Sequence, residues 1–520
     1  MKHILFSLCV LGLCGVACDS DEPTVPTLVP SLDAPVLLDD QLLFVDGPQR
    51  TAALLDVSAE RPEAKSLRVP LPANASLAQR RNGHDEALVL CAGERGDKDT
   101  DPEPATLVAI DDRGRARNYE LGTTPFNALA QSEDGRYAIA YRLGPTRGRT
   151  LDNPNELIVV NLERAPDEDG AVTRKAPDGL GHTLTSVLIS PSMRIAEEDR
   201  RLLVLLSAAE VTLFDLNHLD RRATIVQLNE TRNVDPVQVV FSRVNPTLYV
   251  RTASSDNIFM FRFEPFTNPI PGGNDFQPAI NPLSGGSGPS DMALFGSGSS
   301  ERLLVVAQRS SQALVIDPSS SKTQTIALKN AAERILLWQG LSPRDTNERW
   351  RALLYNDEQP GMTFLDPEEL GSEPADSVEQ LTLTSNPARL IPLLDQQQVI
   401  ALQSTGVNVL DLTKRTVTPI ASAGPLSGAL FDDQRKHLWV GPTGQTWLGS
   451  LDLQSGMTDE LRLDAPIQAL WPMLGHRRLV VLHGESTGYL TLVDLEQPDR
   501  EHALSLRGYL ADALFDRSTP

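Results

Sequence analysis

The chain has 520 residues, of which 47 are Lys or Arg and 69 are Asp or Glu, so its formal net charge is −22. Nucleic-acid binding depends on clustered Lys and Arg side chains that neutralise phosphates, and this acidic balance argues against it. Anionic lipid headgroups would also repel the chain, so a membrane partner requires a covalent anchor. The length is sufficient to bury a sizeable core.

The N-terminal 35 residues predict export. Met1-Lys2-His3 is a positive start, and residues 4–16 are apolar but too few to cross a bilayer, which needs about 20 residues. This layout is typical of a secretory signal peptide. We therefore interpret residues 1–17 as the leader and residues 18–35 as a flexible, polar tether.

The small residues before Cys18 resemble a bacterial lipobox, in which the cysteine is lipidated and becomes the new first residue. The sequence departs from that pattern at Gly15, where Leu is usual. Ordinary signal-peptidase cleavage after Ala17 is the alternative, and it would cut the same bond. The resemblance implies a lipid at Cys18 and a bacterial cell-envelope location, periplasmic or on the outer surface, and leaves the choice of membrane open.

Four cysteines occur, and three of them, Cys9, Cys14 and Cys18, belong to the leader or its cleavage site. Only Cys91 lies in the mature chain, so an intramolecular disulfide is excluded there. Cys91 stands in an apolar run, Ala87 to Ala92, which predicts a buried small hydrophobic residue rather than a reactive thiol.

From residue 36 onward, a short apolar run that ends in Asp, or in a residue taking its place, recurs ten times and is followed by a turn. These landmark residues are Asp56, Asp111, Asn161, Asp215, Arg262, Asp317, Asp366, Asp411, Asp452 and Asp494. Their spacing ranges from 41 residues (Asp411 to Asp452) to 55 residues (Asp56 to Asp111). A period of this length with several short strands indicates a β-propeller. Asp suits the start of each turn because its carboxylate accepts backbone N–H groups two residues on.

The unit over residues 106–141 shows the pattern most fully. Its expected strands are Thr106–Ile110, Ala116–Leu121, Phe126–Ala130 and Tyr137–Tyr141, with an Asp134-Gly135 hairpin turn before the last. This order, with Gly122-Thr123-Thr124-Pro125 between the second and third strands, resembles the YVTN-type surface β-propeller repeats. Residues 289–318 match it less fully. The resemblance implies a repeat protein built of four-stranded blades, although the Tyr-Val-Thr-Asn tetrapeptide is absent.

We expect an all-β fold in which residues 36–520 form a propeller of about eight to ten units. The first unit, Gln41 to Leu71, lacks one strand, and Gly508 to Phe515 at the C-terminus is the strand expected to complete it and close a single ring. One alternative is two rings of about five units, divided in the Pro- and Gly-rich residues 267–300. Another is an eight-bladed ring with insertions.

Candidate chemistry is sparse. Asp97 to Glu103 alternates acidic residues as a Ca²⁺ loop does, but Pro102 occupies the position of the turn glycine and Val108 that of the twelfth ligand, so a solvated loop is expected. Seven mature histidines show no zinc signature: His84, His182, His218, His437, His476, His483 and His502. We expect His476 and His483 to be solvated. Nucleophile-elbow, phosphate-loop and dinucleotide motifs are absent, so we predict no catalytic, metal-binding or cofactor-binding residue.

The favoured hypothesis is an envelope-anchored, non-catalytic propeller lipoprotein that binds an envelope protein or a surface polymer. Its expected contact surfaces are three long loops, Arg142–Asn155, Pro166–His182 and Thr267–Pro289. Two alternatives remain open: a periplasmic or surface hydrolase or lactonase, and a small-molecule binder, each with its site in the propeller channel.

Overall fold

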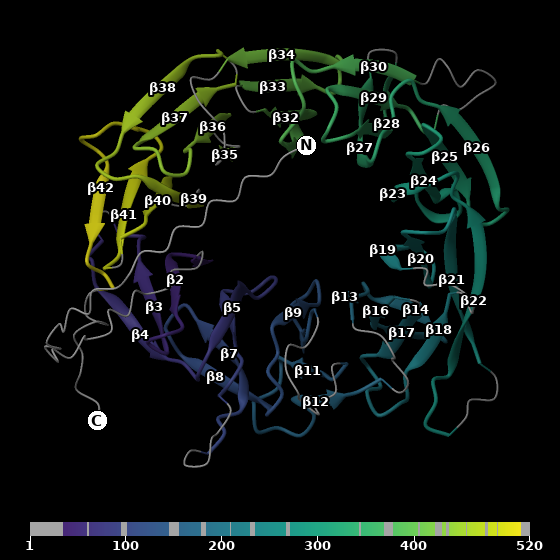
Figure 1. Ribbon diagram of the computed structural model, residues 1–520, viewed down its shortest axis with the longest axis horizontal. Coiled ribbons are helices and arrows are strands. Elements are labelled where there is room, and N and C mark those ends of the chain that lie inside the picture. The colour runs from purple at the N-terminus through teal and green to yellow at the C-terminus, as the bar shows by residue number, and fades with distance from the viewer. Residues whose placement is uncertain are drawn as a thin grey trace, which may run out of the picture.

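A computed structural model shows ten four-stranded antiparallel sheets arranged in one ring (Figure 1). It describes residues 35–510, apart from 60–61, 95–100, 145–154, 178–183, 209, 229–234, 267–270, 343–344, 369–377, 404–405, 422–428, 433–435, 454, 474–476 and 486. No α-helix occurs within those residues. The expected all-β propeller is therefore confirmed, with ten blades.

The first five blades follow the chain from its N-terminal side. Blade 1 is β1 (Val36–Leu38), β2 (Gln41–Asp46), β3 (Thr51–Asp56) and β4 (Ser66–Pro70). Blade 2 is β5 (Ala75–Arg80), β6 (Glu86–Cys91), β7 (Ala105–Asp111) and β8 (Ala116–Gly122). Blade 3 is β9 (Ala128–Gln131), β10 (Tyr137–Tyr141), β11 (Leu157–Asn161) and β12 (Val172–Lys175). Blade 4 is β13 (Ser186–Ile189), β16 (Leu202–Leu206), β17 (Glu210–Asp215) and β18 (Thr224–Gln227), with the hairpin β14 (Met193–Ile195) and β15 (Glu198–Arg200) inserted. Blade 5 is β19 (Pro236–Phe241), β20 (Thr247–Thr252), β21 (Asn257–Pro265) and β22 (Phe276–Ser284).

The remaining five blades complete the ring. Blade 6 is β23 (Pro289–Phe295), β24 (Arg302–Ala307), β25 (Gln312–Asp317) and β26 (Lys322–Ala327). Blade 7 is β27 (Arg334–Ser342), β28 (Asp345–Tyr355), β29 (Gly361–Leu365) and β30 (Val378–Thr382). Blade 8 is β31 (Arg389–Leu393), β32 (Gln398–Leu402), β33 (Gly406–Asp411) and β34 (Thr416–Ala421). Blade 9 is β35 (Ala429–Asp432), β36 (His437–Val440), β37 (Trp447–Asp452) and β38 (Thr458–Arg462). Blade 10 is β39 (Ile467–Met473), β40 (Arg478–His483), β41 (Tyr489–Asp494) and β42 (Leu504–Arg507).

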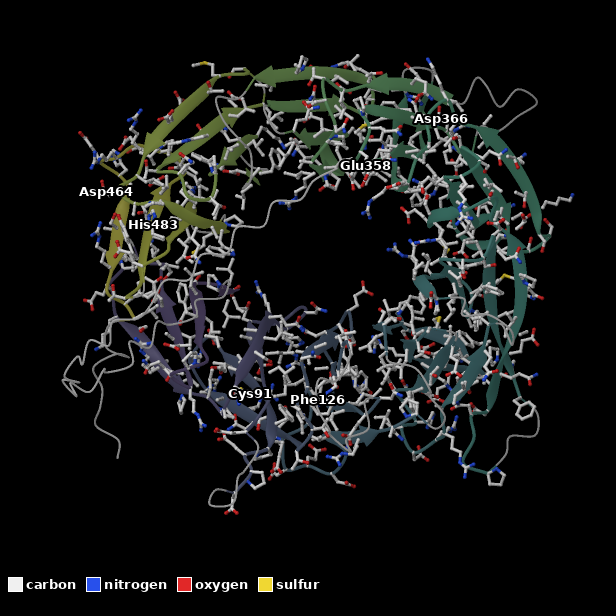
Figure 2. All side chains as sticks on the ribbon, viewed as in Figure 1. Cys91, Phe126, Glu358, Asp366, Asp464 and His483 are labelled. Atoms are coloured by element: carbon white, nitrogen blue, oxygen red, sulfur yellow. The ribbon has the colours of Figure 1, made fainter. Side chains whose placement is uncertain are left out.

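The core lies between neighbouring blades. The second and third strands of a blade are apolar on both faces because another blade covers each face, as the buried runs of β6 and β7 show. Between blades 2 and 3, for example, Leu88 and Leu107 pack in one cluster with Phe126 and Ile158. Figure 2 shows Phe126 and the buried Cys91 within the wall of the ring, away from its centre. Fourth strands, such as β26, are mostly exposed and polar.

The landmark residues end, or directly follow, the third strand of their blades, except Arg262, which lies inside β21. In six blades the landmark side chain accepts the backbone N–H two residues on, as predicted from the sequence. The bonds join Asp56 to Ser58, Asp111 to Arg113, Asn161 to Glu163, Asp215 to Asn217, Asp317 to Ser319 and Asp494 to Glu496, at 2.7 to 3.1 Å. The recurring run thus marks one turn per blade, and we call the face of the ring that carries these turns the Asp-turn face.

Closure of the ring differs from the expectation. Blade 1 has its own first strand, β1, because Val36 and Leu38 are buried in the cluster it shares with blade 2. Gly508 to Leu510 lie in no strand, and residues 511–515 fall outside the described residues. Tyr509 instead packs on Phe44 of blade 1, with ring centroids 5.1 Å apart. Within the described residues, side-chain packing rather than a shared strand therefore joins blade 10 to blade 1.

Residues 267–300 are the candidate boundary between two rings, and their described part, 271–300, contains β22 of blade 5 and β23 of blade 6. Asp291 joins three blades there: it accepts a hydrogen bond from Gln238 Nε2 of blade 5 at 2.7 Å and from the Ile335 backbone N–H of blade 7 at 2.8 Å. The ring is therefore continuous through this stretch.

Candidate functional site

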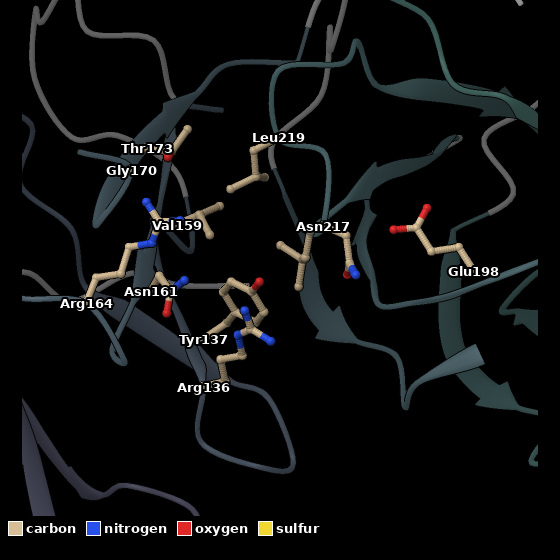
Figure 3. A pocket seen from close by; sticks show the side chains of 11 residues that line it. Arg136, Tyr137, Val159, Asn161, Arg164, Gly170, Thr173, Glu198, Asn217 and Leu219 are labelled. Carbon is tan, nitrogen blue, oxygen red and sulfur yellow. The ribbon is translucent and has the colours of Figure 1, made fainter. Parts of the chain in front are cut away.

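A pocket of about 310 Å³ lies between blades 3 and 4 on the Asp-turn face (Figure 3). Its lining combines side chains from blade 3 with side chains from the turn after β17 and from the inserted hairpin of blade 4. The lining residues are Arg136, Tyr137, Val159, Asn161, Arg164, Gly170, Thr173, Glu198, Leu216, Asn217 and Leu219. A volume of this size lies at the lower end of the range for small-ligand sites.

Strand register builds the blade 3 wall. Tyr137, which begins β10, is paired with Asn161 at the end of β11, and Val159 is paired with Thr173 of β12. Val159 and Asn161 lie two residues apart on one strand, so their side chains share a face. The landmark position therefore contributes directly to the pocket.

Two guanidinium groups enter from the blade 3 side. Arg136 lies over the Tyr137 ring, 5.3 Å from its centroid, and its Nε is 3.1 Å from Glu163. Arg164 pairs with Glu168 at 3.7 Å and donates a hydrogen bond to the Asp169 carbonyl. The Arg136 and Arg164 side chains remain 42% and 43% exposed, so solvent screening weakens both ion pairs and a ligand has access to both groups.

Glu198, from the inserted hairpin, stands across the pocket (Figure 3). Its carboxylate lies 3.1 Å from His218 Nε2 and 2.8 Å from Arg200 Nη2. The hydrogen bond with His218, more than the nearby Arg200 charge, lowers the pKa of Glu198. This side of the pocket therefore keeps a negative charge at neutral pH.

A buried ionic network fixes that hairpin. Arg200 is 2% exposed and pairs with Asp215 at 3.1 Å and with Asp275 of blade 5 at 2.8 Å. Arg221 reaches the same Asp275 at 2.8 Å. The hydrogen bond from Arg200 lowers the pKa of Asp275 to about 2, so this carboxylate is ionised at neutral pH, whereas burial raises the pKa of Asp215. Blade 4 is thus held to blade 5, and the pocket wall is preorganised.

The lining offers both hydrogen-bond donors and acceptors. Burial raises the pKa of Tyr137, so its phenol is neutral and can donate or accept a hydrogen bond. The two arginines donate, Glu198 accepts, and the Asn161 and Asn217 amides do both. The residues that line this pocket include no Ser, Cys or His that could act as a nucleophile or shuttle a proton.

The predicted site residues do not converge on this pocket. Cys18, the expected lipid attachment site, lies outside the described residues. Cys91 is buried as predicted, and burial raises the pKa of its thiol to about 12. Of the acidic stretch at 97–103, only residues 101–103 are described, and Glu103 accepts hydrogen bonds from Arg50 and the Ala73 backbone. In the described part of the chain, no three His, Cys, Asp or Glu residues form a group that could hold a metal ion.

The expectation that His483 is solvated was wrong. It ends β40, is fully buried, and its ring nitrogens lie 3.0 Å from the Pro466 carbonyl and 2.9 Å from Thr491 Oγ1. His84 lies exposed in a turn, as expected. His182 and His476 fall outside the described residues.

Two of the three expected contact loops contain strands. Pro166–His182 includes β12, and Thr267–Pro289 includes β22. The sequence did not predict these strands, because an exposed, polar fourth strand has the composition of a loop. Most of Arg142–Asn155 lies outside the described residues. Gly170 and Thr173 of the second loop do line the pocket, so that prediction overlaps the site. The signal that could have located the pocket is Asn161, the single amide among ten landmarks.

No protein-family model and no curated protein matches this chain. Among solved structures, a dihydro-heme d1 dehydrogenase, NirN, in complex with DHE is similar over 94% of this chain and 79% of its own, with 12% identity and a TM-score of 0.40. A eukaryotic initiation factor is 11% identical over 76% of this chain and 90% of its own, with a TM-score of 0.45. Apo AztD from Citrobacter koseri is 11% identical over 73% and 95%, with a TM-score of 0.35.

Within the described residues, no helix has the length and apolar character needed to cross a membrane.

Proposed function

We propose that this chain is a lipid-anchored bacterial envelope protein whose propeller binds an envelope protein or a surface polymer without catalysing a reaction. The observation that carries the binding role is the open, polar pocket between blades 3 and 4, with half-exposed Arg136 and Arg164 on one side and Glu198 on the other. A site lined by hydrogen-bond donors and acceptors from two blades supports recognition of a partner.

The anchor rests on the N-terminal sequence. Leader residues 1–17 end in small residues directly before Cys18, and the polar residues 18–35 give the length of a tether. The full chain carries a net charge of −22 and gains nothing from anionic lipid headgroups, so a covalent lipid supplies the membrane attachment.

In-cell crosslinking of the tagged full-length protein, followed by affinity purification and mass spectrometry, tests the binding role. We expect a stoichiometric envelope protein or polymer that is lost when Arg136 and Arg164 are both replaced by Gln. The matched control is Arg462→Gln, which removes one charge from an exposed side chain of blade 9 and should retain the partner. Recovery of the wild-type protein alone would contradict the proposal.

Metabolic labelling with a palmitate analogue tests the anchor separately. The wild-type chain should incorporate the label, and Cys18→Ser should not. If the wild-type protein is not labelled, Cys18 carries no lipid and the leader is cleaved by ordinary signal peptidase.

A further inference from the structure

A second pocket, of about 450 Å³, lies against blade 6. Its lining residues are Arg302, Val315, Asp317, Lys322, Thr323 and Gln324. Asp317 is the landmark residue of its blade, so this pocket opens on the same Asp-turn face as the first.

The two pockets occupy equivalent positions in the repeat. In the first, Tyr137, which begins β10, is paired with Asn161, and in the second, Arg302, which begins β24, lies 3.4 Å from the Asp317 carboxylate. In both, the residue two before the landmark is paired with a fourth-strand residue. The equivalent lining residues are Tyr137 and Arg302, Val159 and Val315, Asn161 and Asp317, and Thr173 and Gln324. Because the blades repeat around the ring, the two pockets face the same way, three blades apart.

Both pockets gather positive charge in an acidic protein. The first has Arg136 and Arg164 against Glu198, and the second has Arg302 and Lys322 against Asp317. Each lining therefore has one more cationic than anionic side chain, and Glu163 and Glu168, which pair with the two arginines of the first pocket, lie outside its lining. Lys322 and Arg136 are both accessible to a ligand. Local cations of this kind can overcome the long-range repulsion of an anionic ligand.

The remaining lining groups are suited to hydroxyl-rich ligands. Asn161 and Asn217 in the first pocket, and Thr323 and Gln324 in the second, can each donate and accept hydrogen bonds. A protein partner would instead be anchored by large apolar side chains in a desolvated centre, and most residues that line these two pockets are polar.

We propose that one extended acidic polysaccharide binds along the Asp-turn face and places units in both pockets. This inference rests on the proposed scaffold function and names the polymer class. Two equivalent subsites on one rigid ring favour a long repeating ligand, because the second contact forms at high effective concentration once the first has formed.

The test is a binding titration of the full chain, solubilised in detergent, with alginate as the acidic probe, dextran as the neutral one and inorganic polyphosphate as a non-sugar polyanion. Long alginate should bind at least about 100-fold more tightly than its disaccharide, because only the long chain can occupy both pockets. Its affinity should fall as salt is raised, and dextran and polyphosphate should bind weakly.

Arg136→Gln and Lys322→Gln test the two subsites individually. Each substitution should lower the affinity for long alginate by about tenfold, because one charge-assisted hydrogen bond is lost. Each should leave disaccharide binding at the other pocket unchanged. Arg462→Gln, on the outer strand of blade 9, should have no effect. Folding of each variant is verified by circular dichroism, and Lys322→Glu gives a second variant at the exposed position.

Three results would overturn the inference: equal binding of dextran and alginate, tighter binding of polyphosphate than of alginate, or no binding of long alginate. If long alginate does not bind but crosslinking captures a protein, the scaffold function is supported and the polysaccharide inference is wrong. If neither a polymer nor a protein is bound, both fall.

Discussion

At the scale of single residues, the landmark side chain decides where each blade turns. Asp317 shows the interaction in full: it accepts the Ser319 backbone N–H at 2.9 Å and the Ser319 hydroxyl at 2.6 Å. Asp56 makes the same pair of bonds with Ser58 in blade 1. A short polar side chain at a strand end satisfies donors that the sheet leaves free, which is why Asp recurs at this position.

Asp317→Ala should lower the free energy of unfolding by about 1–2 kcal/mol, because two hydrogen bonds within the turn are lost. Asp317→Asn keeps one acceptor oxygen and should lose less. Chemical denaturation at pH 7 measures both. Equal stability of Asp317→Ala and the wild type would contradict a stabilising role for the landmark.

Asp317 also predicts an acid dependence. The Ser319 hydrogen bond lowers the pKa of Asp317 from 3.8 to about 2. A carboxylate with a depressed pKa in the folded state stabilises the fold above its unfolded pKa and loses that contribution as pH falls toward the folded value. The stability difference between wild type and Asp317→Asn should therefore be constant above about pH 5 and shrink between about pH 4 and 2. Denaturation midpoints across that range test the sign, and a difference that grows on acidification would refute it.

At the scale of elements, buried ion pairs join neighbouring blades. Asp366, directly after β29 of blade 7, accepts two hydrogen bonds from Arg415 of blade 8, at 2.6 and 2.7 Å, and lies 3.2 Å from Arg351. All three residues are buried. Asp366 thus lacks the local turn bond made by the other landmarks described above and instead ties two blades together.

Removing the Asp366 carboxylate should lower the free energy of unfolding strongly. Asp366→Ala leaves two buried guanidinium groups without their shared carboxylate and should destabilise the protein by about 3–5 kcal/mol. Lys414→Ala is the matched control, since it breaks the exposed Lys414–Asp411 pair in blade 8 and should cost less than about 1 kcal/mol. Thermal unfolding of the two variants side by side is the measurement, and similar losses would show that the buried pair has no special role.

The sequence predicted elements with strong local signals and missed those determined by tertiary contacts. Third strands were predictable because each is a buried apolar run followed by a turn residue. The fourth strands β12 and β22 were not, because an exposed outer strand has no apolar face to mark it. The burial of His483 depends on Thr491 and the Pro466 carbonyl, which only the folded blade brings together.

The sequence predicted only a small part of the candidate site, the loop Pro166–His182. Asn161 and the stretch containing Gly170 and Thr173 were noticed in the sequence, but their partner Glu198 comes from the next blade. Nothing in the local sequence of Glu198 indicates that its hairpin folds against that side. A site assembled between blades leaves no contiguous motif.

At the scale of the whole molecule, the ring is closed by packing between its first and last blades. Phe44, Leu55 and Tyr509 share one apolar cluster with residues of blade 10. The Tyr509 carbonyl accepts hydrogen bonds from Ser66 Oγ at 2.8 Å and Arg68 Nη2 at 3.0 Å, both on β4. Closure therefore depends on a short segment after the last strand.

Tyr509→Ala should destabilise the protein by about 3–5 kcal/mol by opening a cavity at this junction. Tyr509→Phe should be neutral or slightly stabilising, because the buried hydroxyl has no hydrogen-bond partner among the described residues. In Tyr509→Ala, the rate of backbone hydrogen exchange should increase first in β2 and β41. An increase confined to distant blades would contradict closure at this point.

The central claim is that the Asp-turn face binds the partner, and site-specific photo-crosslinking in cells tests it most directly. A photoreactive residue at Lys322 would stand on that face, whereas one at Arg309, in the turn between β24 and β25, would stand at the opposite end of the same blade. We predict that the envelope partner or polymer is captured from position 322 and not from position 309. Capture from 309 alone, or from neither position, would contradict the account.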